Sequence, residues 1–153
     1  MDISNFIRTG DLASLKAAVE NQQDLISQAG PNGFTPLVLA TYYDQKEIAE
    51  YLLDKGAKIN AQDAAGNTAL MGVCFKGFTE IAKMLIERGA EVNIVNYSGA
   101  TALIYAASFG KIDIVRLLLE AGADKDIHDA QGKTAHAHAK LQGSIELVNL
   151  LED

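Results

Sequence analysis

Short apolar stretches alternate with polar or glycine-containing breaks along the chain, and the apolar residues within each stretch have helical spacing. Leu103, Ala106 and Ala107, for example, recur in steps of three and four, which places them on one side of an α-helix. A glycine or a polar residue then ends the stretch. These breaks are Asp44, Gly77, Gly110 and Gly143. The pattern predicts a series of short helix pairs, with one helix before each break and one after it.

The second helices are predicted at residues 47–54, 80–87, 113–120 and 145–151. The first three are each followed by a glycine, which can end a helix in the left-handed conformation. These glycines are Gly56, Gly89 and Gly122. The segment 1–32 predicts a less regular pair, with apolar residues around Ile7 and Leu15 and a break at Gly10.

Two sequence motifs recur along the chain, and both keep the same constant spacing. Gly-x-Thr-x-Leu begins at Gly33, Gly66 and Gly99, and it returns at Gly132 with His136 in place of the leucine. A leucine-rich helix end followed by Gly-Ala keeps the same step and occupies residues 52–57, 85–90 and 118–123. Each motif threonine stands where a hydroxyl group can cap the first helix of a pair. These threonines are Thr35, Thr68, Thr101 and Thr134.

This 33-residue period, with Thr-Pro-Leu at residues 35–37, resembles the ankyrin repeat over nearly the whole chain. The resemblance implies an all-α fold, an ankyrin-repeat solenoid of stacked helix-turn-helix units with projecting β-turn tips. We expect a single domain over residues 1–153, with capping repeats at 1–32 and 132–153 and full repeats at 33–65, 66–98 and 99–131. The two end units depart from the motif and are polar, as caps of a solenoid are, which favours a complete small protein or an excised domain with its natural caps.

The chain departs from the family at one position of the Thr-Pro-Leu-His motif. In the family that histidine joins a hydrogen-bond network between turns, whereas here the position holds Val38, Met71, Ile104 and Ala137. We therefore expect the stack to rely more on apolar packing than on polar contacts between turns.

The cysteine and two of the histidines are the candidates for catalytic or metal-binding groups. Cys74 lies two repeats from His136 and His138, and neighbouring helices pack about 8–10 Å apart, so no nucleophile and base meet. The two histidines are two residues apart and point to different sides of a helix, and no cysteine or carboxylate cluster completes a metal site. We expect Cys74 to pack between helices, a structural or surface role for both histidines, and no enzymatic activity, cofactor or metal.

Composition and charge bear on the partner and the compartment. The chain has 153 residues, a net charge of −7 and one cysteine. An acidic chain lacks the basic face that nucleic acids and anionic membranes require, so we expect neither as a partner. The chain has no apolar run long enough to span a membrane, and its N-terminal residues are acidic and polar where a secretory signal would be basic and then apolar. We expect a monomer in the cytoplasm, where a single free thiol stays reduced.

Partner-binding residues follow from the resemblance, because ankyrin-like proteins bind through the turn tips and the exposed side of the first helices. Six of the ten Tyr and Phe residues fall on these positions. Exposed aromatic residues are frequent binding hot spots, although some of these six could instead fill gaps between repeats. Tyr43, Lys76 and Phe109 hold equivalent positions and are expected to line one stripe. The predicted residues are Phe34, Tyr42, Tyr43, Asn67, Phe75, Lys76, Tyr97, Ser98, Ser108 and Phe109.

One modification site is also suggested by the family. The sequence around Asn93 resembles the one that asparaginyl hydroxylases accept in animal ankyrin repeats, with Asn93 as the target. The alternative, which we favour, is that Asn60 and Asn93 hydrogen-bond the turn between repeats.

Three functions come into consideration for the chain. The first is a non-enzymatic protein-protein interaction module that binds a partner protein through its concave face and turn tips. The second is a regulatory subunit or inhibitor of a partner enzyme, which uses the same surface. The third, an enzyme, requires a pocket with convergent titratable groups, and the sequence does not indicate one.

Overall fold

The computed structural model describes residues 2–152, and these residues form ten α-helices, one 3₁₀-helix and no β-strand. The longest helix has ten residues, and no helix in this range is long and apolar enough to cross a membrane. The α-helices are α1 (Ser4–Thr9), α2 (Leu12–Asn21), α3 (Pro36–Tyr42), α4 (Lys46–Asp54), α5 (Ala69–Lys76), α6 (Thr79–Glu87), α7 (Ala102–Ser108), α8 (Ile112–Glu120), α9 (Ala135–Gln142) and α10 (Ile145–Leu151).

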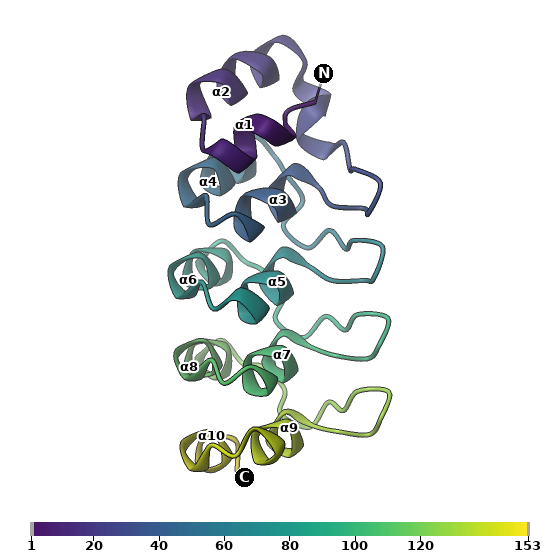
Figure 1. The fold of residues 1–153 in the computed structure, drawn as a ribbon, viewed down its shortest axis with the longest axis vertical. Helices are drawn as coiled ribbons and strands as arrows, with labels where there is room; N and C mark the ends of the chain where they lie inside the picture. The colour runs from purple at the N-terminus through teal and green to yellow at the C-terminus, as the bar shows by residue number, and fades with distance from the viewer. Residues whose placement is uncertain (1, 153) are drawn as a thin grey trace.

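The helices form five pairs that stack on one another along the long axis of the molecule (Figure 1). Within a pair the two helices contact each other, and the first helices α1, α3, α5, α7 and α9 contact one another in series. The second helices form the neighbouring layer, and the turns between pairs project on the opposite side (Figure 1). The all-α stack of helix-turn-helix units that the sequence predicts is therefore confirmed.

The four motif threonines begin the first helices, as predicted. Each has extended backbone angles, and each side-chain oxygen accepts a hydrogen bond from the backbone N–H three residues later, at 3.2–3.3 Å. Gly56, Gly89 and Gly122 follow the second helices with φ between +90° and +97°. Because each motif residue begins or ends a helix, the helix pairs repeat along the chain with the same 33-residue step as the motifs.

Residues at equivalent positions of successive repeats line up to form the core. Leu37, Leu70 and Leu103 are 1–2% exposed and continue one column of leucines through the first helices. The second helices contribute a column of fully buried aliphatic residues, namely Ile48, Ile81, Ile114 and Leu147. Cys74 is completely buried among the first helices, which confirms its predicted packing role.

The two end units differ from the middle of the stack. After α2 the chain makes a 3₁₀-helix, Gln23–Ser27, that the sequence pattern did not predict, and this helix buries Leu25. In the last unit His136 takes the column position of the leucines and is half-buried, and its Nε2 atom is buried without a hydrogen-bond partner. Leu25 and His136 are thus side chains of the end units that the repeat motif does not specify.

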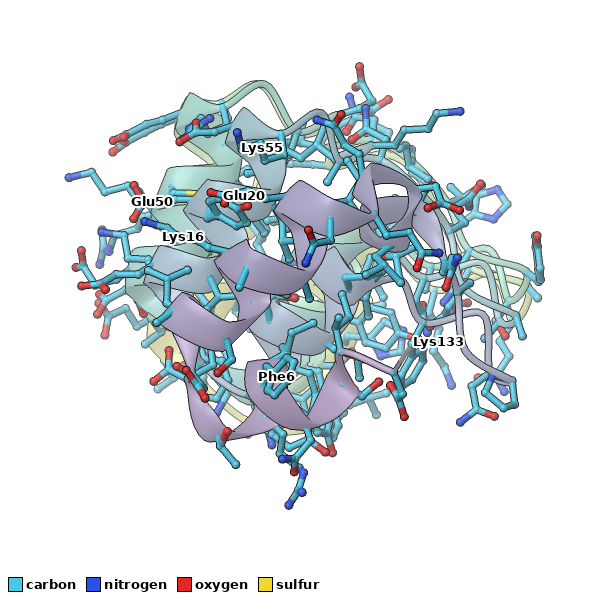
Figure 2. All side chains as sticks on the ribbon, turned by 90° about the horizontal axis from the view of Figure 1, so that it is seen from above. Phe6, Lys16, Glu20, Glu50, Lys55 and Lys133 are labelled. Atoms are coloured by element: carbon cyan, nitrogen blue, oxygen red, sulfur yellow. The ribbon has the colours of Figure 1, made fainter. Side chains whose placement is uncertain are left out.

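Figure 2 views the stack from its N-terminal end and separates two surfaces. Lys16 and Glu20 of α2, Glu50 of α4 and Lys55, which follows α4, lie on the side of the second helices, whereas Lys133 lies on the side of the projecting turns (Figure 2). Lys16 and Lys55 place their ammonium groups within 5.6 and 5.8 Å of the Tyr51 ring centroid. The outer side of this part of the stack is therefore a charged surface.

Backbone hydrogen bonds join the turn tips, and we call these bonds the tip ladder. The N–H groups of Ala64, Tyr97 and Ala130 donate to carbonyl oxygens of the preceding turn at 3.0–3.1 Å; the acceptors are Asn32, Ala65 and Ser98. A second link lies nearer the helices. There the side-chain oxygens of Asn60 and Asn93 accept from the N–H groups of Glu91 and Asp124 at 2.9 and 2.8 Å, which confirms the turn contact favoured for both asparagines.

Candidate protein-binding face

The exposed side of the first helices α3, α5 and α7 carries a cluster of aromatic side chains, and we call this surface the inner face. Tyr42 and Tyr43, at the end of α3, meet edge to face with ring centroids 5.2 Å apart. Phe75 of α5 and Phe109, which follows α7, meet in the same way at 4.8 Å. All four rings stand at the end of α3, α5 or α7 or directly after it.

A hollow of about 300 Å³, which we call the aromatic groove, lies between these helices. Aromatic rings from three successive units form much of its lining, and they are Phe34, Tyr42, Phe75, Tyr105 and Phe109. Asp63 and Asn67, from the turn before α5, add polar groups to the same lining. The groove therefore combines a broad apolar wall with a few polar atoms, as binding sites commonly do.

The structure brings together most of the predicted residues. Phe34, Tyr42, Asn67, Phe75 and Phe109 line the aromatic groove. Two more lie beside it, because Tyr43 packs on Tyr42 and the Lys76 ammonium group lies 4.5 Å from the centroid of the Tyr42 ring. Lys76 contacts Tyr42 and Phe109 contacts Phe75, so each packs on an aromatic residue of the preceding unit, and the stripe of Tyr43, Lys76 and Phe109 stays a prediction.

The other three predicted residues lie outside the groove. Tyr97 stands at a turn tip, 74% exposed, and its ring covers Gly66 so closely that a Cβ atom there would lie 2.8 Å from the ring. Ser98 belongs to the same tip, where its carbonyl oxygen accepts a tip-ladder hydrogen bond. Ser108 is half-buried at the end of α7 and does not line the groove.

Sequence reasoning missed the polar residues that join each turn to the following helix. Asn96 is 6% exposed, and its side-chain nitrogen donates to Asn67 Oδ1 at 2.8 Å and to the Tyr105 hydroxyl at 2.9 Å. One unit later, His138 Nε2 lies 2.8 Å from Asp129 Oδ2. These polar contacts join a turn to its own first helix, and the expected reliance on apolar packing does not account for them. The register of the repeats could have indicated these contacts. It places Asn96 and Asp129 at one equivalent position and Tyr105 and His138 at another.

The Asp129 carboxylate shows how strongly a turn is held. Its Oδ1 atom accepts hydrogen bonds from the N–H groups of Gln131 and Lys133, both at 3.0 Å. Burial alone would raise the pKa of Asp129, but the hydrogen bonds from His138, Lys133 and Gln131 together hold this pKa below its ordinary value. The turn thus stabilises the charged form of the carboxylate.

The cysteine of this chain lies inside the stack and not on the inner face. Burial raises the pKa of the Cys74 thiol, so this group stays protonated and unreactive inside the stack. Among residues 2–152, no three His, Cys, Asp or Glu side chains are grouped as a metal site would need. The inner face carries exposed aromatic area with a few hydrogen-bonding groups.

Comparison with known proteins gives the same fold class. A family model described as ankyrin repeats in three copies matches residues 4–63, 60–129 and 93–153. The chain is 39% identical over 61 residues to rat ankyrin repeat and SAM domain-containing protein 6, a match that covers 40% of the chain and 7% of that protein. It is 45% identical over 51 residues to the mouse protein fem-1 homolog A-like, a match that covers 33% of the chain and 8% of the relative.

A third similarity is to chicken NF-kappa-B inhibitor alpha, at 44% identity over 61 residues, which covers 40% of the chain and 17% of that protein. The chain thus spans only a small part of the length of these relatives. Ankyrin repeats form a non-enzymatic fold that serves generally as a protein-protein interaction module. Because the family model matches nearly the whole chain, this protein belongs to the ankyrin repeat family.

Proposed function

We propose that this chain is a non-enzymatic binding module that holds a partner protein on its inner face and turn tips. The observation that carries the proposal is the exposed aromatic cluster around the aromatic groove. Tyr42, Phe75 and Phe109 are 42–50% exposed although they are large and contact other rings. Aromatic side chains that meet on a surface in this way are the residues that most often dominate a protein interface.

The packing of the rings makes them suitable for binding at low entropic cost. The Phe75 ring is held against Phe109, and the Tyr105 ring lies parallel to the Phe109 ring with centroids 6.4 Å apart. A partner that covers these rings removes apolar area from water, while the rings have little freedom left to lose. The tip residues Tyr97 and Ser98 extend the proposed surface beyond the groove.

The proposal is tested by affinity capture from a lysate of the source organism. The wild-type chain is compared with a variant in which Tyr43, Phe75, Tyr97 and Phe109 are all changed to Ser. A matched control carries Val95→Ser and Ile145→Ser, which remove exposed apolar side chains outside the predicted set. Circular dichroism verifies that all three proteins are folded. The proposal expects a protein that the wild type and the control capture and the aromatic variant loses.

Equal capture by the wild type and the aromatic variant would contradict the proposal. Such a result would move the binding surface to the second helices or to the ends of the stack. The proposed residues would then serve only to fill gaps between repeats.

The second candidate is a regulatory subunit or inhibitor of a partner enzyme. It is favoured by the similarity to NF-kappa-B inhibitor alpha, a protein named for inhibition, although the match covers only 17% of that relative. The surface involved would be the same inner face. An activity assay on the captured partner, with and without the chain, distinguishes the two roles because an inhibitor lowers that activity and a plain binding module leaves it unchanged.

A further inference from the structure

The carboxylate of Asp63 lines the aromatic groove. The first helix of its unit lacks the ring that contacts the equivalent turn residue in each of the next two units. Tyr105 and His138 occupy equivalent positions of consecutive repeats, and each contacts the polar residue that begins its turn. In the unit before them the equivalent residue is Gly72, and a Cβ atom built there would meet nothing within 4 Å. The space that a tyrosine or histidine ring fills elsewhere is therefore open at this point.

Asp63 is the acidic residue that lines the groove beside this open space. Its Oδ1 atom accepts hydrogen bonds from the N–H groups of Ala65 and Asn67, both at 2.9 Å, as Asn96 and Asp129 do in their own turns. Its Oδ2 atom makes no hydrogen bond to any residue in the range 2–152. Asp63 is 9% exposed and lines the groove together with Gly72. The carboxylate thus has one oxygen fixed by the turn and one available to a ligand.

The aromatic walls of the groove also suit a positive charge. The chain places its own Lys76 ammonium group over the Tyr42 ring, at 4.5 Å from the centroid, which is a cation-π contact. Lys76 ends α5 whereas Asp63 precedes the same helix, so the length of eight helical residues, about 12 Å, lies between the two groups. Among the described residues that line the groove, none is basic.

We infer that the aromatic groove accepts a basic side chain, Lys or Arg, of the partner protein. The aliphatic stem of that side chain lies along Phe75 and Phe109, and its charged head donates a hydrogen bond to Asp63 Oδ2. Such side chains bury their stems on apolar surfaces while the charge finds a partner. The net charge of −7 favours the approach of a basic segment. This inference rests on the proposed function and specifies the chemistry of the partner.

Two variants isolate the carboxylate without changing the fold. Asp63→Asn keeps the turn, because Asn96 already performs the same backbone contacts one unit later with Oδ1 distances of 2.9 Å. Gly72→Tyr restores the side chain found at Tyr105 and fills the groove. Neither change removes an exposed aromatic residue of the inner face.

The test is a titration of the isotope-labelled full chain, followed by NMR at the amides of Asp63, Ala65 and Gly72. The probes are N-acetyl-arginine amide and N-acetyl-lysine amide, with the uncharged N-acetyl-citrulline amide and N-acetyl-norleucine amide as matched controls. We expect saturable shifts with a basic probe and at least about tenfold weaker binding of the uncharged probes, since a hydrogen bond to a charged group is involved. Asp63→Asn weakens binding of the basic probe by a similar factor, and Gly72→Tyr abolishes it.

Three results would overturn the inference. They are the absence of shifts with either basic probe in the wild type, equal shifts with the uncharged probes, and unchanged binding in Asp63→Asn. The capture experiment separates this failure from failure of the proposed function. If the Asp63→Asn variant still captures a partner that the aromatic variant loses, the proposed binding function stands. Only the inference that the partner inserts a basic side chain is then rejected.

Discussion

The hydroxyl oxygen of Tyr105 accepts a hydrogen bond from Asn96 Nδ2 at 2.9 Å, across nine residues of chain. This bond joins the turn before α7 to the middle of that helix. It provides a polar contact at the turn in a chain that lacks the histidine of the Thr-Pro-Leu-His motif. Tyr105 stands one residue after Ile104, which holds the histidine position of the motif.

The first prediction concerns this bond. Tyr105→Phe removes one hydrogen bond and is expected to lower the free energy of unfolding by about 0.5–1.5 kcal/mol. Asn96→Ala should cost more, roughly 1–3 kcal/mol, because it also leaves the N–H groups of Ser98 and Ala100 without their acceptor. Urea denaturation of the two variants measures both values. Equal stability of Asn96→Ala and the wild type would show that the turn does not depend on this side chain.

The second prediction runs in the opposite direction. Gly72→Ala is expected to raise the free energy of unfolding by about 0.5–1 kcal/mol, because glycine inside a helix is less favourable than alanine. Gly72 has no positive φ, and the added methyl group meets no atom within 4 Å. Thermal melts provide the measurement, with Gly77→Ala as the contrasting control. Gly77 has φ +82°, so the same change there should destabilise the chain.

The third prediction tests the core columns. Leu70→Ala and Leu103→Ala each remove a side chain that is 1–2% exposed and are expected to cost about 2–5 kcal/mol. Leu141→Ala is the matched control, since Leu141 is 70% exposed. Denaturant unfolding should show a large loss for the two core variants and little for the control. If both core variants unfolded at the same denaturant concentration as the wild type, the proposed register of the repeats would be contradicted.

The fourth prediction concerns pH. Because the pKa of Asp129 is lower in the folded chain than its ordinary value of 3.8, this residue contributes stability above that value. The contribution is lost as the pH falls through the lower, folded-state pKa. Asp129→Asn should therefore show a smaller loss of stability than the wild type when the pH is lowered from about 5 to about 2. Unfolding curves with the same pH dependence for both proteins would exclude this role of Asp129.

The fifth prediction concerns the asparagine links between units. Asn93→Ala removes the acceptor for the Asp124 N–H and is expected to cost about 0.5–1.5 kcal/mol. Hydrogen exchange at the Asp124 amide should accelerate in the variant. The amide of Glu91 serves as the internal reference, because its N–H donates the equivalent hydrogen bond to Asn60 one unit earlier. Equal exchange rates at the Asp124 amide in the variant and the wild type would rule out the link.

The repeated parts of the fold were predictable because each position is present several times in the sequence. The four capping threonines and the leucine column could be read from the constant step of the repeats alone. The 3₁₀-helix at Gln23–Ser27 could not, because that segment has no equivalent elsewhere in the chain and Leu25 is buried by tertiary contacts. Local pattern is informative only where the pattern recurs.

The candidate site was predictable in part for the same reason. The aromatic residues were located by their positions on the first helices, and five of the ten predicted residues line one groove. Asp63 was missed because its environment depends on a side chain that is absent at Gly72. Recognising that absence requires Tyr105 and His138 as comparisons, and their contacts are visible only in the folded chain.

The tip ladder also has a direction, and the first turn differs from the later ones at Pro31. Pro31 holds in the first turn the position that Ala64 holds in the next, and the hydrogen bonds of Gly30 and Gly33 around it match those of Asp63 and Gly66. Ala64 is a donor of the ladder, but proline has no N–H to give. Another chain that approached this edge would find no hydrogen-bond donor at that position. A proline at the position of Ala64 therefore leaves the first turn without the donor that each later turn supplies to the ladder.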